Sequence, residues 1–377
     1  MTVHSADVAI LGGGFAAWVC ACALRDRGVA VAVLHRRQAA AGPAVGEYLP
    51  PEGISAIAAL GLGDILDAPA HRACAGVLSA WGDARPVRQD TLMHPGSRAL
   101  NLDRAVLVRD LAARGRSRGV GTVSCSGVPA LGGRPGAWVV DLATPAGAAQ
   151  VRARFLVDAT GRSAALARAR GARVLRQDGL VGLAAVHAPA PVDDSALRIE
   201  SLPDGWCYAA PLSGDRLAAV FLTDAVGLPA GQSARTALAA ERLRHSRLIG
   251  PHLGSARPAF RVVPAWSQWT EPGAGPGWIA IGDAAMAFDP LASAGLTKAL
   301  EDVRRVADTL ASGRQADPDR LAAERAARFA GYRRGLATAY AAERRHDGPF
   351  WARRRAPAET PVQDAAARLK STGEAGA

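Results

Sequence analysis

The stretch Asp7-Val-Ala-Ile-Leu-Gly12-Gly-Gly14-Phe-Ala-Ala17 decides the fold of this 377-residue chain. Its apolar run is typical of a parallel strand buried on both faces, and an Ala- and Leu-rich helix should follow and end at Gly28. The spacing Gly12-x-Gly14-x-x-Ala17 indicates a dinucleotide-binding turn, in which Gly12 permits the turn and Gly14 lets a pyrophosphate approach the helix N-terminus. The alternative is a glycine-rich turn of another α/β fold. We therefore expect the turn to contact a dinucleotide through Gly12, Gly14, Phe15, Ala16 and Ala17.

A second motif near the other end of the chain reads Gly277-Trp-Ile-Ala-Ile-Gly282-Asp283-Ala-Ala-Met-Ala-Phe-Asp289-Pro290-Leu-Ala-Ser293-Ala-Gly295-Leu296. It predicts a buried strand, a loop and a helix start. The Asp283 carboxylate suits the hydroxyl groups of a ribityl chain, and the helix N-terminus favours the ring edge that gains negative charge on reduction. In this order the two motifs indicate FAD rather than a nicotinamide nucleotide. The expected contacts here are Gly282, Asp283, Pro290, Gly295 and Leu296.

The predicted second strand, residues 29–34, lacks the terminal acid that usually binds the ribose hydroxyls of a dinucleotide. His35 stands in that place, and a neutral imidazole can accept one hydrogen bond from a hydroxyl group. The alternative is a surface histidine without a ligand. Arg36 and Arg37 would lie near the adenosine end of the cofactor.

A third buried strand, residues 155–158, ends in the loop Ala159-Thr160-Gly161-Arg162-Ser163. Ligands of open α/β sheets bind beyond the carboxyl ends of the strands. We therefore expect Asp158 and Gly161 at the cofactor crevice. The alternative is an ordinary turn with a surface arginine.

The order of segments predicts an α/β fold, in which a β-sheet substrate domain is inserted into a doubly wound, Rossmann-like FAD-binding domain. The FAD-binding domain would take residues 1–75, 99–178 and 274–345, and the substrate sheet residues 76–98 and 179–273. Residues 346–377 would form a C-terminal tail, with residues 353–377 frayed or disordered. Residues 39–51 are Gly-, Ala- and Pro-rich and should form a loop. The spacing of apolar residues predicts a helix over residues 102–114, with Asp103 near its start, where an acidic residue is favoured by the helix dipole.

Composition narrows the functional classes. The net charge of +11 comes mainly from arginine, since the chain has 43 Arg and two Lys. The basic residues do not form a dense cluster with interleaved aromatic residues, so we do not expect nucleic-acid binding. The five cysteines show no metal-ligand spacing, so we expect buried free thiols and no metal. No uncharged apolar run approaches the ~18 residues that span a bilayer, and no signal peptide is recognised. We expect a cytoplasmic protein without membrane contact.

The motifs together resemble the flavin-dependent aromatic monooxygenase and halogenase superfamily, which has the para-hydroxybenzoate-hydroxylase-like fold. The resemblance is strongest to the tryptophan-halogenase-like branch, which includes flavoproteins that mature quinone-cofactor oxidases. The matching segments follow the family's order along nearly the whole chain: residues 12–17, 46–51, 102–104, 158–163, 205–212, 282–300 and 349–354. The resemblance implies bound FAD and an aromatic substrate.

Departures from the halogenase pattern narrow the implied chemistry. Halogenases carry Trp-x-Trp-x-Ile-Pro where this chain has Trp206-Cys-Tyr208-Ala-Ala-Pro211. They hold hypohalous acid on a lysine that follows a Gly-Glu-Ser loop, whereas this chain has no lysine before Lys298. Ala292 stands where tryptophan halogenases have a glutamate. The resemblance therefore implies a flavin C4a-hydroperoxide that transfers oxygen directly to an electron-rich ring.

Direct hydroxylation needs a positioned cofactor and a dry pocket more than a strong side-chain acid. Glu47 is the candidate catalytic acid, base or flavin strap, and a solvated loop glutamate is the alternative. Arg104 would bind the flavin phosphates or ribityl chain, or else a surface acid. The aromatic residues that would line the substrate pocket, unless they form sheet core, are Tyr48, Trp206, Tyr208, Trp266 and Trp269.

We predict an FAD-dependent monooxygenase that hydroxylates an electron-rich aromatic group, with tryptophan and indole as candidates and a polypeptide or carrier as its bearer. Reducing equivalents would come from NAD(P)H or from reduced flavin supplied by a reductase. One alternative is a flavin-dependent halogenase. Another is a flavin-poor accessory or maturation protein that binds a client polypeptide, as His35 and the basic charge suggest. The intact glycines of both motifs argue against the accessory protein.

Overall fold

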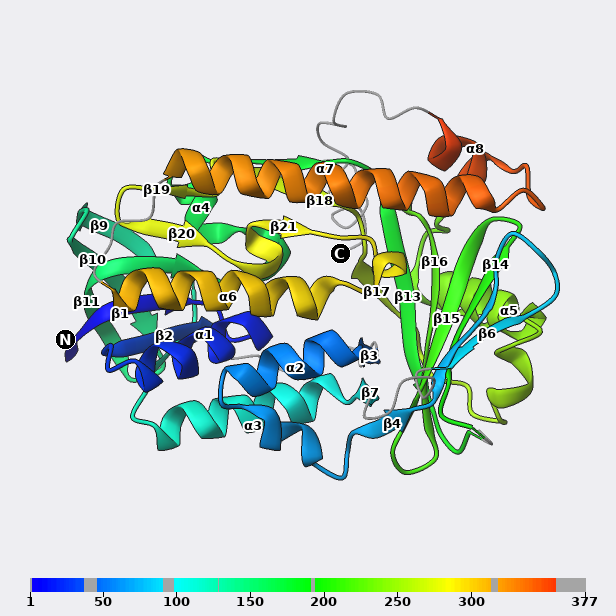
Figure 1. Ribbon diagram of the computed structural model, residues 1–377, viewed down its shortest axis with the longest axis horizontal. Helices are drawn as coiled ribbons and strands as arrows, with labels where there is room; N and C mark the ends of the chain where they lie inside the picture. The colour runs from blue at the N-terminus through cyan, green and yellow to red at the C-terminus, as the bar shows by residue number, and fades with distance from the viewer. Residues whose placement is uncertain are drawn as a thin grey trace.

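The computed structural model describes residues 2–36, 46–90, 98–127, 129–190, 194–312 and 318–356. Two large sheets stand at opposite ends of the molecule, and helix α7 (Pro318–Ala342) runs along both (Figure 1). Within the described ranges, no helix combines the length and the apolar character needed to cross a membrane.

The first sheet is built on parallel strands in the order β20-β11-β1-β2-β8. These are β1 (Thr2–Leu11), β2 (Val31–Arg36), β8 (Gly121–Cys125), β11 (Gly147–Asp158) and β20 (Trp278–Ala280). The short β19 (Ala274–Gly275) extends the edge beyond β20. Along β1, Val8 and Ile10 face one core while Ala9 and Leu11 face another, so the predicted burial on both faces is confirmed.

Different elements cover the two faces of this sheet. One face packs against α1 (Phe15–Asp26), α2 (Pro51–Ala59), α3 (Arg104–Ser117) and α6 (Gly295–Ala311). The other packs against β10 (Ala137–Thr144), which is paired with β9 (Ala130–Arg134), and against the short helix α4 (Ala165–Ala169). The carboxyl ends of β1, β11 and β20 thus reach one edge of the sheet, where the two glycine motifs meet.

The second sheet has seven strands in the order β17-β13-β16-β15-β14-β5-β6. They are β5 (Gly76–Ala80), β6 (Val87–Asp90), β13 (Leu180–His187), β14 (Leu197–Leu202), β15 (Gly205–Leu212), β16 (Arg216–Asp224) and β17 (Arg261–Pro264). Helix α5 (Gln232–His245) packs on one face. The other face carries Trp206 and packs against Tyr340 of α7.

Two small sheets join these layers and correct two predictions. One sheet has the order β3 (Glu47–Leu49), β7 (Ala99–Leu102) and β4 (Arg72–Cys74). The other has the order β12 (Arg173–Arg176), β18 (Gln268–Glu271) and β21 (Met286–Ala287). The described end of the predicted loop 39–51 therefore contains a strand, because β3 pairs with the distant β7. The helix predicted from residue 102 begins at Arg104 instead. Leu102 belongs to β7, and the Asp103 carboxylate caps the helix by accepting the N–H groups of the second and third following residues.

The C-terminal segment also differs from the prediction. Helix α8 (Pro349–Arg355) buries Phe350 and Trp351, and Arg353 and Arg354 both pair with Asp224 of β16. The described part of the predicted frayed segment, residues 353–356, is thus fixed to the second sheet.

Candidate active site

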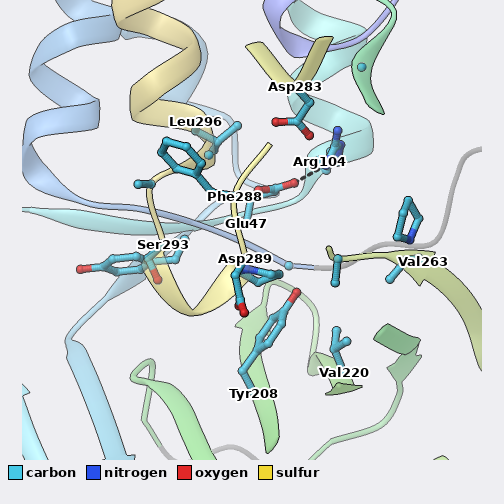
Figure 2. A pocket seen from close by; sticks show the side chains of 18 of the residues that line it. Glu47, Arg104, Tyr208, Val220, Val263, Asp283, Phe288, Asp289, Ser293 and Leu296 are labelled. Atoms are coloured by element: carbon cyan, nitrogen blue, oxygen red, sulfur yellow. Dashed lines mark hydrogen bonds and ion pairs between the residues drawn. The ribbon is translucent and has the colours of Figure 1, made fainter. Parts of the chain in front are cut away.

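A cavity of about 700 Å³ lies between the two large sheets. Gly13, Gly14 and Asp283 line its end beside the first sheet, and Tyr208 and Val263 line its end on the second. Figure 2 shows this arrangement, with Asp283, Arg104 and Glu47 on one side and Tyr208, Val220 and Val263 on the other. The volume lies in the range of small-molecule and cofactor pockets.

The first glycine motif forms a turn that leaves the N-terminus of α1 open to this cavity. Gly12 has φ +127°, and a Cβ there would lie 2.2 Å from the carbonyl oxygen of Ala159, so only glycine fits. At Gly14, the N-cap of α1, nothing lies within 4 Å of a Cβ, and no side chain caps the helix. These free N–H groups fit a pyrophosphate. Phe15 and Ala17 are buried in the core, so their side chains face away from the cavity.

The candidate ribose residue, His35, lies beside the glycine turn but is not among the residues that line the cavity. A Cβ on Gly13 would lie 2.8 Å from the Cβ of His35, which places His35 where the usual acid would stand. Arg36 ends β2 and is exposed. Arg37 lies outside the described residues.

Asp158 is buried and does not line the cavity, contrary to the expectation that it would reach the crevice. Its carboxylate accepts hydrogen bonds from the Thr160 backbone N–H (2.9 Å), the Thr160 hydroxyl (2.6 Å) and the Ala167 N–H (2.8 Å). Burial raises the pKa of this carboxyl. Asp158 therefore fixes the turn that presents Gly161 and Arg162, both of which do line the cavity.

The second glycine motif brings Asp283 to the centre of the site. The Nε atom of Arg162 lies 3.8 Å from one carboxylate oxygen, and the Nζ atom of Lys298 lies 4.0 Å from the other. Arg162 also donates hydrogen bonds to the carbonyl oxygens of Trp266 and Phe288. Two cations therefore flank a carboxylate that faces the cavity, an arrangement that suits an acceptor for cofactor hydroxyl groups.

The backbone around Asp283 is equally constrained. Gly282 has φ +58° and is tightly packed, since a Cβ there would lie 3.0 Å from that of Ala16. Pro290, Gly295 and Leu296 line the cavity, and Gly295 has nothing within 4 Å of a Cβ position. No side chain caps α6, so the N–H groups of its first turn are free to meet a ligand in the cavity.

Glu47 and Arg104 form an ion pair at the cavity wall. The Oε1 atom of Glu47 lies 2.5 Å from Nη1 of Arg104, and this carboxylate raises the pKa of the guanidinium. Glu47 lies on β3 rather than on a loop, and Tyr48 beside it also lines the cavity. The Glu47 carboxylate is engaged by a cation, so it orients Arg104 in this structure.

The second sheet supplies an apolar wall. Trp206 and Tyr208 alternate along β15 and share its cavity face, next to Val220 and Leu222 of β16. Trp266 and Trp269, for which the sequence left open the pocket and the protein core, are not among the lining residues. The Trp266 indole donates to Gln268 (2.7 Å) and packs under Arg176, and Trp269 packs on Phe329.

A hydrogen-bonded chain leads from this wall to Asp289, a lining residue to which the sequence analysis assigned no role. Nε1 of Trp206 donates to the Tyr340 hydroxyl (3.1 Å), which donates to Oδ2 of Asp289 (2.7 Å). Burial, and secondarily the nearby Asp178, raise the pKa of Asp289 to about 6. Asp289 stands within the second quoted motif, but the other members of the chain come from β15 and α7. Local sequence therefore gave no signal of the chain.

Comparison with known sequences agrees with this geometry. Residues 66–376 match the family described as tryptophan halogenase. The putative FAD-dependent oxidoreductase LodB of Marinomonas mediterranea is 25% identical over 304 residues, which cover 78% of this chain and 81% of that protein. The 3-amino-4-hydroxybenzoate 2-monooxygenase of Streptomyces cremeus is 35% identical over 85 residues, or 22% of each chain.

Solved structures show the same architecture. The peptidyl tryptophan dihydroxylase QhpG, essential for tryptophylquinone cofactor biogenesis, superposes with a TM-score of 0.75 at 28% identity, covering 96% of this chain and 81% of that one. The flavin-dependent halogenase CmlS gives a TM-score of 0.79 at 22% identity, covering 99% and 70%. At that identity the likeness to CmlS concerns the fold alone.

Proposed function

The chain belongs to the tryptophan halogenase family of FAD-dependent oxidoreductases, and from this premise we propose that it is a monooxygenase that hydroxylates an electron-rich aromatic group. One observation carries the proposal. Lys298 is the only lysine among the described residues, and it is buried behind Asp283 rather than on the cavity wall. No lysine in that part of the chain is therefore placed to hold hypohalous acid beside a substrate.

The residues at the first-sheet end of the cavity fit FAD. The open α1 N-terminus at Gly14 would hold the pyrophosphate, Asp283 the ribityl hydroxyl groups, and Gly295 with the α6 N-terminus the ring edge. Bound FAD supplies the oxygen-activating redox chemistry. The chain's own task is to position the substrate and to exclude water from it.

The substrate would lie against the wall formed by Tyr208, Val220 and Val263. This wall is apolar apart from the Tyr208 hydroxyl, whose pKa is raised by burial, and it suits an aromatic ring. The similarity to QhpG supports a tryptophan carried by a polypeptide, and the net charge of +11 would attract an acidic bearer. Electrons would come from NAD(P)H, directly or through a flavin reductase.

The decisive experiment offers the FAD-loaded protein reduced flavin, ¹⁸O₂ and bromide together with free tryptophan or tryptophan-containing peptides. We expect ¹⁸O in the product and no bromine, because no lysine lies on the described cavity wall to hold hypobromous acid. A brominated product would assign the halogenase alternative instead. Failure to bind FAD, with retained binding of a client polypeptide, would assign the accessory protein.

A further inference from the structure

A row of oxidisable rings leads from the cavity toward solvent. Tyr208 and Trp206 line the cavity, and their ring centroids are 6.1 Å apart. Trp206 lies 6.0 Å from Trp81, which follows β5 and is only partly buried. Trp81 in turn lies 5.4 Å from Trp351. Every step joins neighbouring rings, and electron transfer between aromatic groups falls steeply with distance.

The same row has a built-in proton acceptor. An oxidised indole becomes a strong acid at Nε1, so its oxidation is favoured where that proton has a place to go. The Trp206 Nε1–H bonds to Tyr340 Oη, and the Tyr340 O–H bonds to the buried Asp289 carboxylate. These hydrogen bonds are continuous from the Trp206 donor to the Asp289 acceptor, and successive hydrogen bonds strengthen one another in surroundings of low dielectric constant.

We propose that Trp206 and Trp81, with Tyr340 and Asp289, form a protective electron relay that carries oxidising equivalents out of the cavity when activated oxygen finds no substrate. A one-electron oxidant of the hydroxyl-radical class takes one electron from the Trp206 indole and is reduced. The Nε1 proton moves to Tyr340 Oη as the Tyr340 proton moves to Asp289. Trp81 then returns one electron to Trp206, both protons move back, and an external thiol or ascorbate reduces Trp81.

A second aromatic cluster lies beside the cavity. Phe288 lines the cavity, and Phe329 stands between it and Trp269, with centroid distances of 6.3 Å and 5.6 Å. The cluster also contains Tyr332, which stacks on Phe288 and lies 5.6 Å from Phe329, but among the described residues it reaches the cavity wall only through Phe288. Phenylalanine rings are far harder to oxidise than indoles. Trp269 therefore provides a matched control, a tryptophan near the cavity but outside the relay.

Blue light tests the relay, because photoexcited FAD is itself a one-electron oxidant. We would illuminate FAD-loaded protein, follow tryptophan radicals by transient absorption and electron paramagnetic resonance, and map oxidised residues by peptide mass spectrometry. We expect oxidation at Trp81 in the wild type, at least a tenfold loss of it in Trp206→Phe, and no change in Trp269→Phe. In Trp81→Phe the cavity is intact, and the Trp206 radical should live longer. In Tyr340→Phe, which lacks the proton acceptor, the radical should show the protonated cation spectrum.

Two results would overturn the relay: undiminished Trp81 oxidation in Trp206→Phe, or an equal loss in Trp269→Phe. An unchanged Trp206 radical lifetime in Trp81→Phe would overturn it as well, even if Trp206→Phe failed to fold. The test needs bound FAD but no hydroxylation. The experiment would therefore still test the relay if the protein proved to be a halogenase.

Discussion

Replacing Asp289 by asparagine should change how stability depends on pH. Burial raises the pKa of this carboxyl from 3.8 to about 6, with Asp178 adding to the shift and Arg354 opposing it. The folded state therefore holds the proton more tightly than the unfolded state does. The resulting stabilisation is fully present below pH 3.8 and is lost as the pH rises through about 6. A rise of the pKa from 3.8 to about 6 corresponds to about 3 kcal/mol of folding free energy, at about 1.36 kcal/mol for each tenfold change in proton affinity.

Asparagine removes this titration but also disturbs two hydrogen bonds, from the Leu291 N–H and from the Tyr340 hydroxyl. That second cost is independent of pH. The stability advantage of the wild type over Asp289→Asn should thus be largest below pH 3.8 and smaller by about 3 kcal/mol at pH 7. Reversible urea unfolding at half-unit pH steps measures the difference between the two proteins. In ¹³C-labelled protein, the aspartate carboxyl signal missing from the variant should titrate near pH 6.

A constant difference between the two unfolding curves from pH 4 to pH 8 would refute the reasoning. It would mean that Asp289 titrates alike in the folded and unfolded states. Asp289 would then serve only as the terminal acceptor of the buried hydrogen-bond chain and as the cap that accepts the Leu291 N–H.

Four further substitutions test the cofactor end of the cavity. His35→Glu should tighten FAD binding about ten- to a hundredfold in a fluorescence titration, because a charged acceptor contributes ~1.5–3 kcal/mol, and unchanged affinity would place His35 away from the ribose. Gly295→Val meets nothing within 4 Å of its Cβ, so circular dichroism and Tm should be retained while turnover is abolished, and full activity would mean that the ring lies elsewhere. Gly12→Ala should lower the free energy of unfolding by about 1–3 kcal/mol through the contact with Ala159, whereas Gly14→Ala should leave the fold intact, and equal effects on unfolding would contradict the turn geometry.

The sequence alone was enough to predict the backbone elements that surround the cofactor end of the cavity. The glycine turn, the end of the apolar strand before it and the helix after it depend on neighbouring residues and were predicted close to their observed bounds, although β1 begins at Thr2, several residues earlier than predicted. The same is true of the loop that leads to α6. Trp206 and Tyr208, named from the sequence as pocket candidates, both line the cavity. Steric limits at glycine and side-chain periodicity act over a few residues, so they can be read along the chain.

Contacts between distant segments were decided by the tertiary structure alone. Strand β3 exists because β7 pairs with it, and Asp158 turns inward because Thr160 and Ala167 offer it donors. Trp266 and Trp269, for which pocket and core were both open from the sequence, pack outside the cavity on Arg176 and Phe329. Asp289 acquires its raised pKa only when α7 buries it against Tyr340. Side-chain direction and desolvation depend on which elements pack together, and neither composition nor periodicity encodes that pairing.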